Sequence, residues 1–110
     1  MSLSISTEKQ AGAAIVHAEG DLDVYTAPRL KEAIEQLMSN RGALIVDLSE
    51  VHFIDSTALG VLVAAHQQIK MNAGDFRLVV GDPFLLKIFH ITGFDSVFSI
   101  FPQVADALPG

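Results

Sequence analysis

One serine stands out as a residue that could take part in chemistry. It belongs to the segment 53–62 (FIDSTALGVL), where Asp55, Ser56 and Thr57 stand at the start of a predicted helix. Each of these three side chains has an oxygen that can accept a hydrogen bond from the unpaired amides of a first helical turn, so helix capping is one interpretation. The neighbours of Ser56 lack the glycines of a nucleophile elbow, and a hydrolase is therefore not predicted.

The residues that follow this triplet are unusual for a surface helix. From Ala58 to Ala65 the sequence is ALGVLVAA, which is apolar or small around the whole circumference, whereas polar residues appear only from His66 onward. A helix on the surface of a small domain normally has one polar face. The first two turns are thus either buried on all sides or exposed for a partner, and Gly60 would let a partner backbone approach closely. We expect a docking surface beside the Ser56 hydroxyl.

Other polar residues offer weaker candidates. Asp21 and Asp23 end a predicted strand, and from the residues alone they are interpreted as shaping a polar turn. An enzyme that uses Asp21, Asp23 and Ser56 on a small substrate is an alternative, but a general base and oxyanion donors are missing. The four histidines lack the spacing of a helical metal motif and are expected to lie on the surface or to be partly packed. No catalytic residue, metal or cofactor is predicted.

Composition narrows the class of protein further. The chain has 110 residues, no cysteine, 13 acidic against 7 basic residues and a net charge of −6. These values favour one domain with a core of its own and argue against nucleic acid or an anionic membrane as the main partner. The mean hydropathy is +0.41, yet no apolar run reaches the ~20 residues that cross a bilayer. No secretory signal is apparent at the start of the sequence, and a cytoplasmic protein is predicted.

Strands and helices alternate along the chain. Alternating residues predict an antiparallel strand pair with one buried face, around a turn at residues 10–12 and ending at Gly20. The remaining predicted strands cover residues 43–48, 76–80 and 97–101, the first of them apolar enough to be covered on both faces. Such alternation implies crossover connections and a mainly parallel or mixed sheet, an α/β fold.

Helical periods and caps predict the helices between these strands. The first is expected to begin after the cap Thr26, to bury Leu30, Ile34, Leu37 and Met38, and to end at Asn40-Arg41-Gly42. The second is expected over residues 57–72, with Gly74 as its stop. A third, capped by Asp82 and ended by Gly93, is expected to place Phe84, Leu85, Ile88 and Phe89 on one face. A short helix over 104–108 completes the chain.

Two segments in register resemble one known family, the STAS-domain anti-sigma factor antagonists of bacteria. Residues 46–49 (VDLS) followed by 53–62 (FIDSTALGVL) are similar to the family's strand and its Asp-Ser-Ser/Thr-Gly/Ala-Leu-Gly motif. Residues 19–23 (EGDLD) and 26–30 (TAPRL) look like the family's Gly-Glu-Leu-Asp segment and the start of the next helix. Ala58 stands where many members have Gly, and Asp21 replaces the commoner Glu. The resemblance covers nearly all of residues 1–110 and implies one STAS domain, with a mixed, mainly parallel sheet of four to five strands and helices mostly on one face.

The resemblance also implies a function. In the family, the unphosphorylated protein binds an anti-sigma factor that is also its serine kinase and so releases the sigma factor, a mechanism known as partner switching. The kinase then phosphorylates the serine that corresponds to Ser56, using ATP and Mg²⁺, and a metal-dependent phosphatase restores the hydroxyl. The expected partner-binding residues are Asp21, Asp23, Asp55, Ser56, Thr57, Ala58, Gly60 and Val61. This would be a transcription regulator rather than an enzyme.

A second binding function stays open. STAS domains also serve as scaffold or regulatory subunits of membrane transporters and large signalling assemblies, and many of those lack the serine. In such a protein Ser56 would be mainly a helix cap. Stable association that does not respond to phosphorylation would distinguish this alternative.

Overall fold

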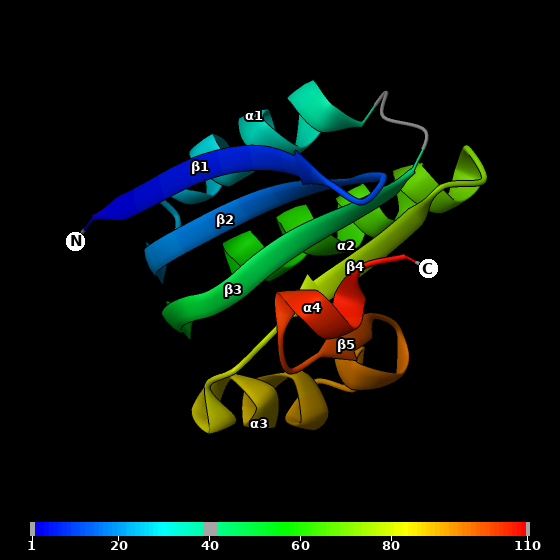
Figure 1. The fold of residues 1–110 in the computed structure, drawn as a ribbon. Helices are drawn as coiled ribbons and strands as arrows, with labels where there is room; N and C mark the ends of the chain where they lie inside the picture. The colour runs from blue at the N-terminus through cyan, green and yellow to red at the C-terminus, as the bar shows by residue number, and fades with distance from the viewer. Residues whose placement is uncertain (1, 39–41, 110) are drawn as a thin grey trace.

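A single five-stranded sheet organises the chain. The computed structural model describes residues 2–38 and 42–109. The strands lie in the order β1-β2-β3-β4-β5 (Figure 1). Strand β1 (Leu3–Gln10) runs antiparallel to β2 (Ala13–Leu22), whereas β3 (Ala43–Ile54), β4 (Asp75–Val79) and β5 (Ser99–Phe101) run parallel to β2. The prediction of a mixed, mainly parallel sheet is confirmed.

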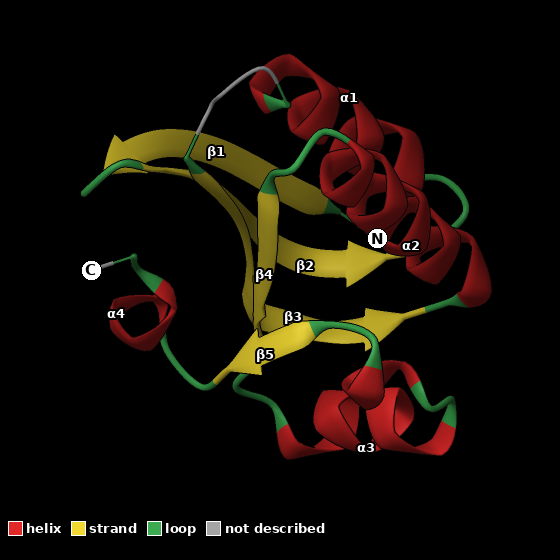
Figure 2. Cartoon of the chain, turned by 90° about the vertical axis from the view of Figure 1, so that its right-hand side faces the viewer, coloured by secondary structure: helices red, strands yellow, loops and turns green. Residues whose placement is uncertain are grey.

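Helices cover the two faces of the sheet unequally. Helices α1 (Ala27–Leu37), α2 (Ser56–Met71) and α3 (Pro83–Ile91), with the 3-10 turn η1 (Phe94–Ser96), lie on one face, and α4 (Val104–Ala107) lies on the other (Figure 2). Within the described ranges, no helix has both the length and the apolar character needed to span a membrane. The expected arrangement of helices mostly on one face is therefore confirmed.

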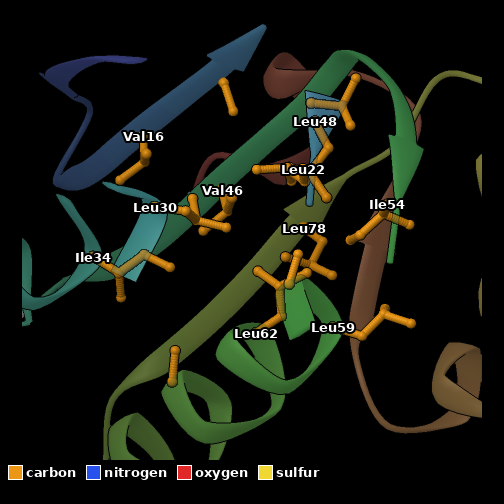
Figure 3. Packing of buried hydrophobic residues seen from close by; sticks show 14 of the residues in the cluster. Val16, Leu22, Leu30, Ile34, Val46, Leu48, Ile54, Leu59, Leu62 and Leu78 are labelled. Atoms are coloured by element: carbon orange, nitrogen blue, oxygen red, sulfur yellow. The ribbon is translucent and has the colours of Figure 1, made fainter. Parts of the chain in front are cut away.

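The main core fills the space between the sheet and its three larger helices. Side chains from β2, β3 and β4 meet those of α1 and α2 in one continuous cluster, which includes Val16, Val46, Leu78, Leu30 and Leu62 (Figure 3). Each of these five residues is fully buried. Burial of one such aliphatic side chain contributes about 1.5–3 kcal/mol, so this cluster is the principal source of stability.

A smaller second core explains the most apolar strands. The other face of the sheet packs against α4 through Ile15, Ile45, Val79 and Ala107. Residues 43–48 are buried on both faces as expected. The second strand of the hairpin differs from the prediction, because Ala14 and Val16 face the main core while Ile15 faces the second one. One buried face was predicted, and this part of β2 has two.

Two strands run further than their apolar patterns indicated. Strand β2 continues through Gly20 to Leu22, and β3 continues past Leu48 to Ile54. Gly20 has a φ of 122° and the register shifts beside it. A methyl group there would stand 2.2 Å from the carbonyl oxygen of Ser2. Gly20 therefore permits a bulge and a close backbone contact instead of ending the strand.

Helix boundaries agree with prediction except in detail. The predicted stop of α1 at Asn40-Arg41 lies outside the described residues. Helix α2 ends through Ala73, which has a φ of 59°, and the Gly74 amide donates to the Ile69 carbonyl at 2.8 Å. The prediction that Phe84 shares one helix face with Leu85 is wrong, because 63% of Phe84 is exposed while Leu85 is buried. Neighbouring residues point about 100° apart on a helix, so only one of the two faces the core.

Candidate functional site

The carboxyl ends of β2 and β3 bring the two polar segments together. In the parallel pair, Asp21 lies opposite Phe53 and Leu22 lies opposite Ile54. The Asp55 amide, one residue further, donates a hydrogen bond to the Leu22 carbonyl at 3.0 Å. The β2–α1 loop and the start of α2 are consequently neighbours at one edge of the sheet, where ligands of open α/β folds commonly bind.

Asp55 is the residue that caps α2. Its backbone is extended, with φ −107° and ψ 179°, and its side-chain oxygen accepts a hydrogen bond from the Ala58 amide at 3.0 Å. Ser56 and Thr57 are exposed in the first turn and cap nothing within the described part of the chain. Of the three possible caps in this triplet, one is used, and the Ser56 hydroxyl is free toward solvent.

The beginning of α2 has an outer face of small residues. Ala58, Leu59, Leu62 and Ala65 are buried against the sheet and neighbouring helices. The opposite side carries Ser56, Gly60 and Ala64, four residues apart, all exposed, with Val61 and Val63 half-buried beside them. A methyl group added at Gly60 would have no heavy atom within 4 Å. This outer face, called the α2 ridge below, consists of Ser56, Gly60 and Ala64.

Two hollows flank the α2 ridge. On one side an open, mainly apolar groove is lined by Ser56, Leu59, Gly60 and Val63 together with Thr92 and Phe94, which follow α3. On the other side a small apolar hollow between α1 and α2 is lined by Ile34, Met38, Val61 and Ala65 among others. Sequence reasoning missed Thr92 and Phe94, because nothing in the local pattern shows that the turn after α3 approaches α2.

The predicted partner-binding residues fall into two groups. Asp21, Asp55 and Val61 are half-buried, and Ser56, Thr57 and Gly60 are exposed, so all six can be reached from solvent. Ala58 is fully buried and Asp23 is only 5% exposed. In the structure, Ala58 lies beneath the α2 ridge and Asp23 lies inside the β2–α1 loop.

Asp23 holds the β2–α1 loop from within. Its Oδ1 accepts hydrogen bonds from the amides of Tyr25 and Thr26, each at 2.9 Å, and lies 3.1 Å from the Thr26 hydroxyl. Burial raises the pKa of Asp23, but the bonds donated by Thr26 and Tyr25 outweigh burial and bring this pKa below its ordinary value. Thr26 occupies the predicted cap position of α1 without capping through its side chain.

Carboxylates dominate the charge beside this edge. Asp82, which caps α3 by accepting from the Phe84 amide at 2.8 Å, lies 2.7 Å from Nδ1 of His52. This hydrogen bond raises the pKa of His52, and the negative charges of Asp82, Glu50 and Asp21 add to the effect in spite of partial desolvation. These acidic residues thus favour the protonated form of His52.

The remaining histidines have structural surroundings. Nδ1 of His17 lies 2.7 Å from Asp47, and Nδ1 of His90 lies 2.8 Å from Asp95. The His66 ring packs edge-on against Phe98, with ring centroids 5.4 Å apart. The prediction of surface or partly packed histidines is confirmed. Among the described residues, no group of three or more His, Cys, Asp or Glu has the geometry of a metal site.

Comparison with known proteins adds evidence that is independent of this geometry. The STAS domain family model matches residues 4–107. The anti-sigma-B factor antagonist of Listeria monocytogenes is 33% identical over 102 residues, which are 91% of this chain and 90% of that protein. The anti-sigma-F factor antagonist RsfB of Mycobacterium tuberculosis is 32% identical over 110 residues, which are 99% of this chain and 89% of RsfB.

Solved structures agree with these relatives. The crystal structure of an anti-sigma factor antagonist from Mycobacterium paratuberculosis is similar with a TM-score of 0.88 and 33% sequence identity. The match covers 97% of this chain and 92% of that one. This relative therefore has the same overall fold as the present chain.

Proposed function

This chain belongs to the STAS domain family, and from that premise we propose that it is an anti-sigma factor antagonist. In this proposal the unphosphorylated protein binds an anti-sigma factor in the cytoplasm and so releases the sigma factor that the anti-sigma factor holds. The names of the relatives above support this function. The observation that carries it on this chain is the exposed Ser56 hydroxyl at the end of the α2 ridge, beside an apolar groove.

The α2 ridge is the proposed docking surface. Gly60 and Ala64 project little or no side chain, so a partner backbone can approach α2 closely. Apolar surface from Val63 and Phe94 lies in the groove beside them and would be removed from water on binding. Asp21, Asp55, Thr57 and Val61 surround this surface, while Ala58 supports it from beneath. An apolar centre with a polar rim is typical of a protein–protein interface.

Phosphorylation of Ser56 is proposed as the switch. A serine kinase activity of the anti-sigma factor transfers the γ-phosphoryl group of ATP to the Ser56 oxygen, ADP leaves, and a metal-dependent phosphatase later hydrolyses the phosphoester. The chain itself contributes the acceptor hydroxyl and performs no chemistry in this scheme. The phosphate adds about −1.5 to −2 charges at a position that docking would desolvate.

The two states of Ser56 should differ in binding and hardly at all in folding. In the free protein, the N-terminus of α2 favours an anion by about 0.3–1 kcal/mol, and the neighbouring Asp55 opposes it by a similar, salt-screened amount. In the complex, a phosphate buried against apolar surface without a partner costs several kcal/mol. Each 1.4 kcal/mol is a factor of ten in affinity, so phosphorylation is expected to weaken the complex by orders of magnitude.

A phosphorylation assay tests this function directly. The purified chain is incubated with the anti-sigma factor kinase of the same genome and Mg-ATP, and the product is mapped by mass spectrometry. We expect one phosphate on Ser56 in the wild type, none in Ser56→Ala, and normal modification in the matched control Ser99→Ala, which removes an exposed hydroxyl from β5 away from the α2 ridge. Ser56→Ala should still bind the kinase, and Ser56→Asp should bind poorly.

The same assay identifies the outcomes that contradict the proposal. Unmodified Ser56 in a reaction where the kinase is active would refute the switch. Equal affinity of the kinase for phosphorylated and unphosphorylated chains would refute it as well. Stable association with a transporter or signalling complex, unchanged by phosphorylation, would support a scaffold function in its place.

A further inference from the structure

The β2–α1 loop reverses the usual distribution of polar and apolar residues. Asp23 is only 5% exposed, while Val24 is 53% and Tyr25 is 83% exposed. Acidic residues are almost never fully buried unless they are paired. Here a buried, hydrogen-bonded carboxylate stands directly before two neighbouring exposed apolar side chains, Val24 and Tyr25.

Hydrogen bonds fix the backbone on both sides of Tyr25. Asp23 Oδ1 accepts from the Tyr25 and Thr26 amides, and the Asp23 amide donates to the Thr26 hydroxyl at 2.9 Å. The Thr26 hydroxyl lies 2.8 Å from the Asp21 carbonyl, and the Ala27 amide donates to the Asp23 carbonyl at 2.8 Å. The loop is thus preorganised, and only the two side-chain torsions of Tyr25 remain to be ordered on binding.

The loop belongs to the same edge as Ser56. The Leu22 carbonyl, one residue before Asp23, accepts the amide of Asp55, one residue before Ser56. Figure 2 shows β2 and β3 ending side by side, with the loop and the start of α2 following them. A partner that contacts Ser56 therefore has the β2–α1 loop within its reach.

We infer that Tyr25 is an anchor that the anti-sigma factor buries, and that Asp23 is a positioning residue that presents Tyr25 without touching the partner. The inference rests on the proposed function and deepens it. Tyrosine is enriched among the few residues that dominate binding energy, because its ring buries a large area at low entropic cost. A contact at Tyr25 would extend the interface from the α2 ridge to the β2–α1 loop.

Charge indicates what the partner offers at this position. The half-buried carboxylates of Asp21 and Asp82, together with Glu50, act on His52 near the end of β3, the strand that pairs with β2, and the chain as a whole has a net charge of −6. The complementary surface is an apolar pocket for the Tyr25 ring with lysine or arginine side chains around it. The anti-sigma factor is the occupant to which the proposal commits.

The first test truncates the anchor. Binding of the same anti-sigma factor kinase is measured by calorimetry for the wild type, Tyr25→Ala, Tyr25→Phe and Met71→Ala. We expect Tyr25→Ala to weaken binding about 30-fold or more, as truncated anchors do, and Tyr25→Phe to stay within about three-fold of the wild type because the ring remains. Met71 is the matched control: it is 85% exposed at the far end of α2, and its truncation should change nothing.

The second test separates positioning from direct contact at Asp23. Asp23→Asn keeps an oxygen that can accept from the Tyr25 and Thr26 amides but removes the charge, whereas Asp23→Ala removes both. If Asp23 positions Tyr25, Asp23→Asn retains most of the affinity and the salt dependence of binding. If the charge itself contacts the partner, Asp23→Asn binds as poorly as Asp23→Ala and loses part of the salt dependence, which would overturn this role.

A double-mutant cycle completes the experiment. Because Asp23 acts through Tyr25 in this scheme, Asp23→Ala should weaken binding much less in a Tyr25→Ala background than in the wild type. Fully additive effects would contradict the positioning role. If the wild type binds and Tyr25→Ala binds equally well, the anchor is refuted while the proposed function stands. If the wild type does not bind the kinase, both are refuted.

Discussion

Substitution of Gly60 measures how much stability the chain loses by having glycine on the proposed docking surface. Gly60 lies inside α2, where glycine is about 1 kcal/mol less favourable than alanine. A methyl group at this position would have no heavy atom within 4 Å, so Gly60→Ala introduces no clash. We therefore expect Gly60→Ala to raise the free energy of unfolding by about 1 kcal/mol. For a chain of this length the unfolding entropy converts that gain into about 4 °C in the melting temperature.

Gly93 is the matched control for this argument. A methyl group at Gly93 also has no heavy atom within 4 Å, but Gly93 has a φ of 78°. Alanine in that left-handed conformation costs about 1–2 kcal/mol. Thermal unfolding followed by circular dichroism should thus show Gly60→Ala above and Gly93→Ala below the wild type. A lower melting temperature for Gly60→Ala would show that the fold needs this glycine and would refute the reasoning.

A larger side chain at Gly60 tests whether a partner docks on the α2 ridge. Gly60→Gln places a good helix former on the α2 ridge, so its melting temperature should equal or exceed that of the wild type by about 2 °C. Its affinity for the anti-sigma factor should fall by at least ten-fold if a partner backbone approaches Gly60, since a buried side chain of this size forces the surfaces apart. Wild-type affinity of a stable Gly60→Gln variant would show that the partner does not dock on this face.

Further predictions concern titration and capping. An NMR titration of the imidazole rings should place the pKa of His52 above the ordinary value of about 6.5, because of its bond to Asp82, and the pKa of His66 below that value, because of burial; the reverse order would contradict both causes. Because the His52 pKa is raised in the folded state, protonated His52 stabilises the fold. This stabilisation is fully present below about pH 6.5, and it is lost as the pH rises through the raised pKa of His52. The Asp82 pKa is lowered by the same bond, so the Asp82 side is lost only as the pH falls through that lowered pKa; urea unfolding of His52→Gln across pH should lose this dependence, and an unchanged profile would be evidence against the pair. Asp55→Ala should lower the free energy of unfolding by about 1 kcal/mol while Asp55→Asn stays within a few tenths, as expected for a cap; equal losses in thermal unfolding would show that the charge matters more than the hydrogen bond.

The fold was largely predictable, because its elements have strong local patterns. The alternation in residues 3–19 predicts the hairpin, and the apolar run 43–48 predicts a strand covered on both faces. The end of β3 was not predictable in the same way. Glu50 and His52 interrupt the apolar pattern there. This part of the strand is only partly covered, with Val51 and Ile54 buried and the residues around them exposed or half-buried.

The site shows the same division between local and tertiary information. A cap at the start of α2 follows from the local sequence, but the choice of Asp55 over Ser56 and Thr57 does not. The small, apolar character of the first two turns is local as well, whereas the exposure of one side of them is decided by tertiary packing. The internal role of Asp23 in the β2–α1 loop is not a local feature either, because only the loop geometry shows that Asp23 accepts from the amides of Tyr25 and Thr26. The contribution of Phe94 to the groove depends on how α3 and η1 fold back toward α2, which no periodicity records.

The bond between the Asp55 amide and the Leu22 carbonyl is the last rung of the ladder that joins the two central strands. Segments separated by more than thirty positions meet there, and no further backbone pairing of β2 with β3 follows it. The hydrogen-exchange rate of the Asp55 amide therefore reports whether the β2–α1 loop, which carries Tyr25, is held beside Ser56 at the start of α2. In the proposed function, a chain that keeps its core but loses this hydrogen bond would still melt as a folded protein, and it would bind the anti-sigma factor less tightly.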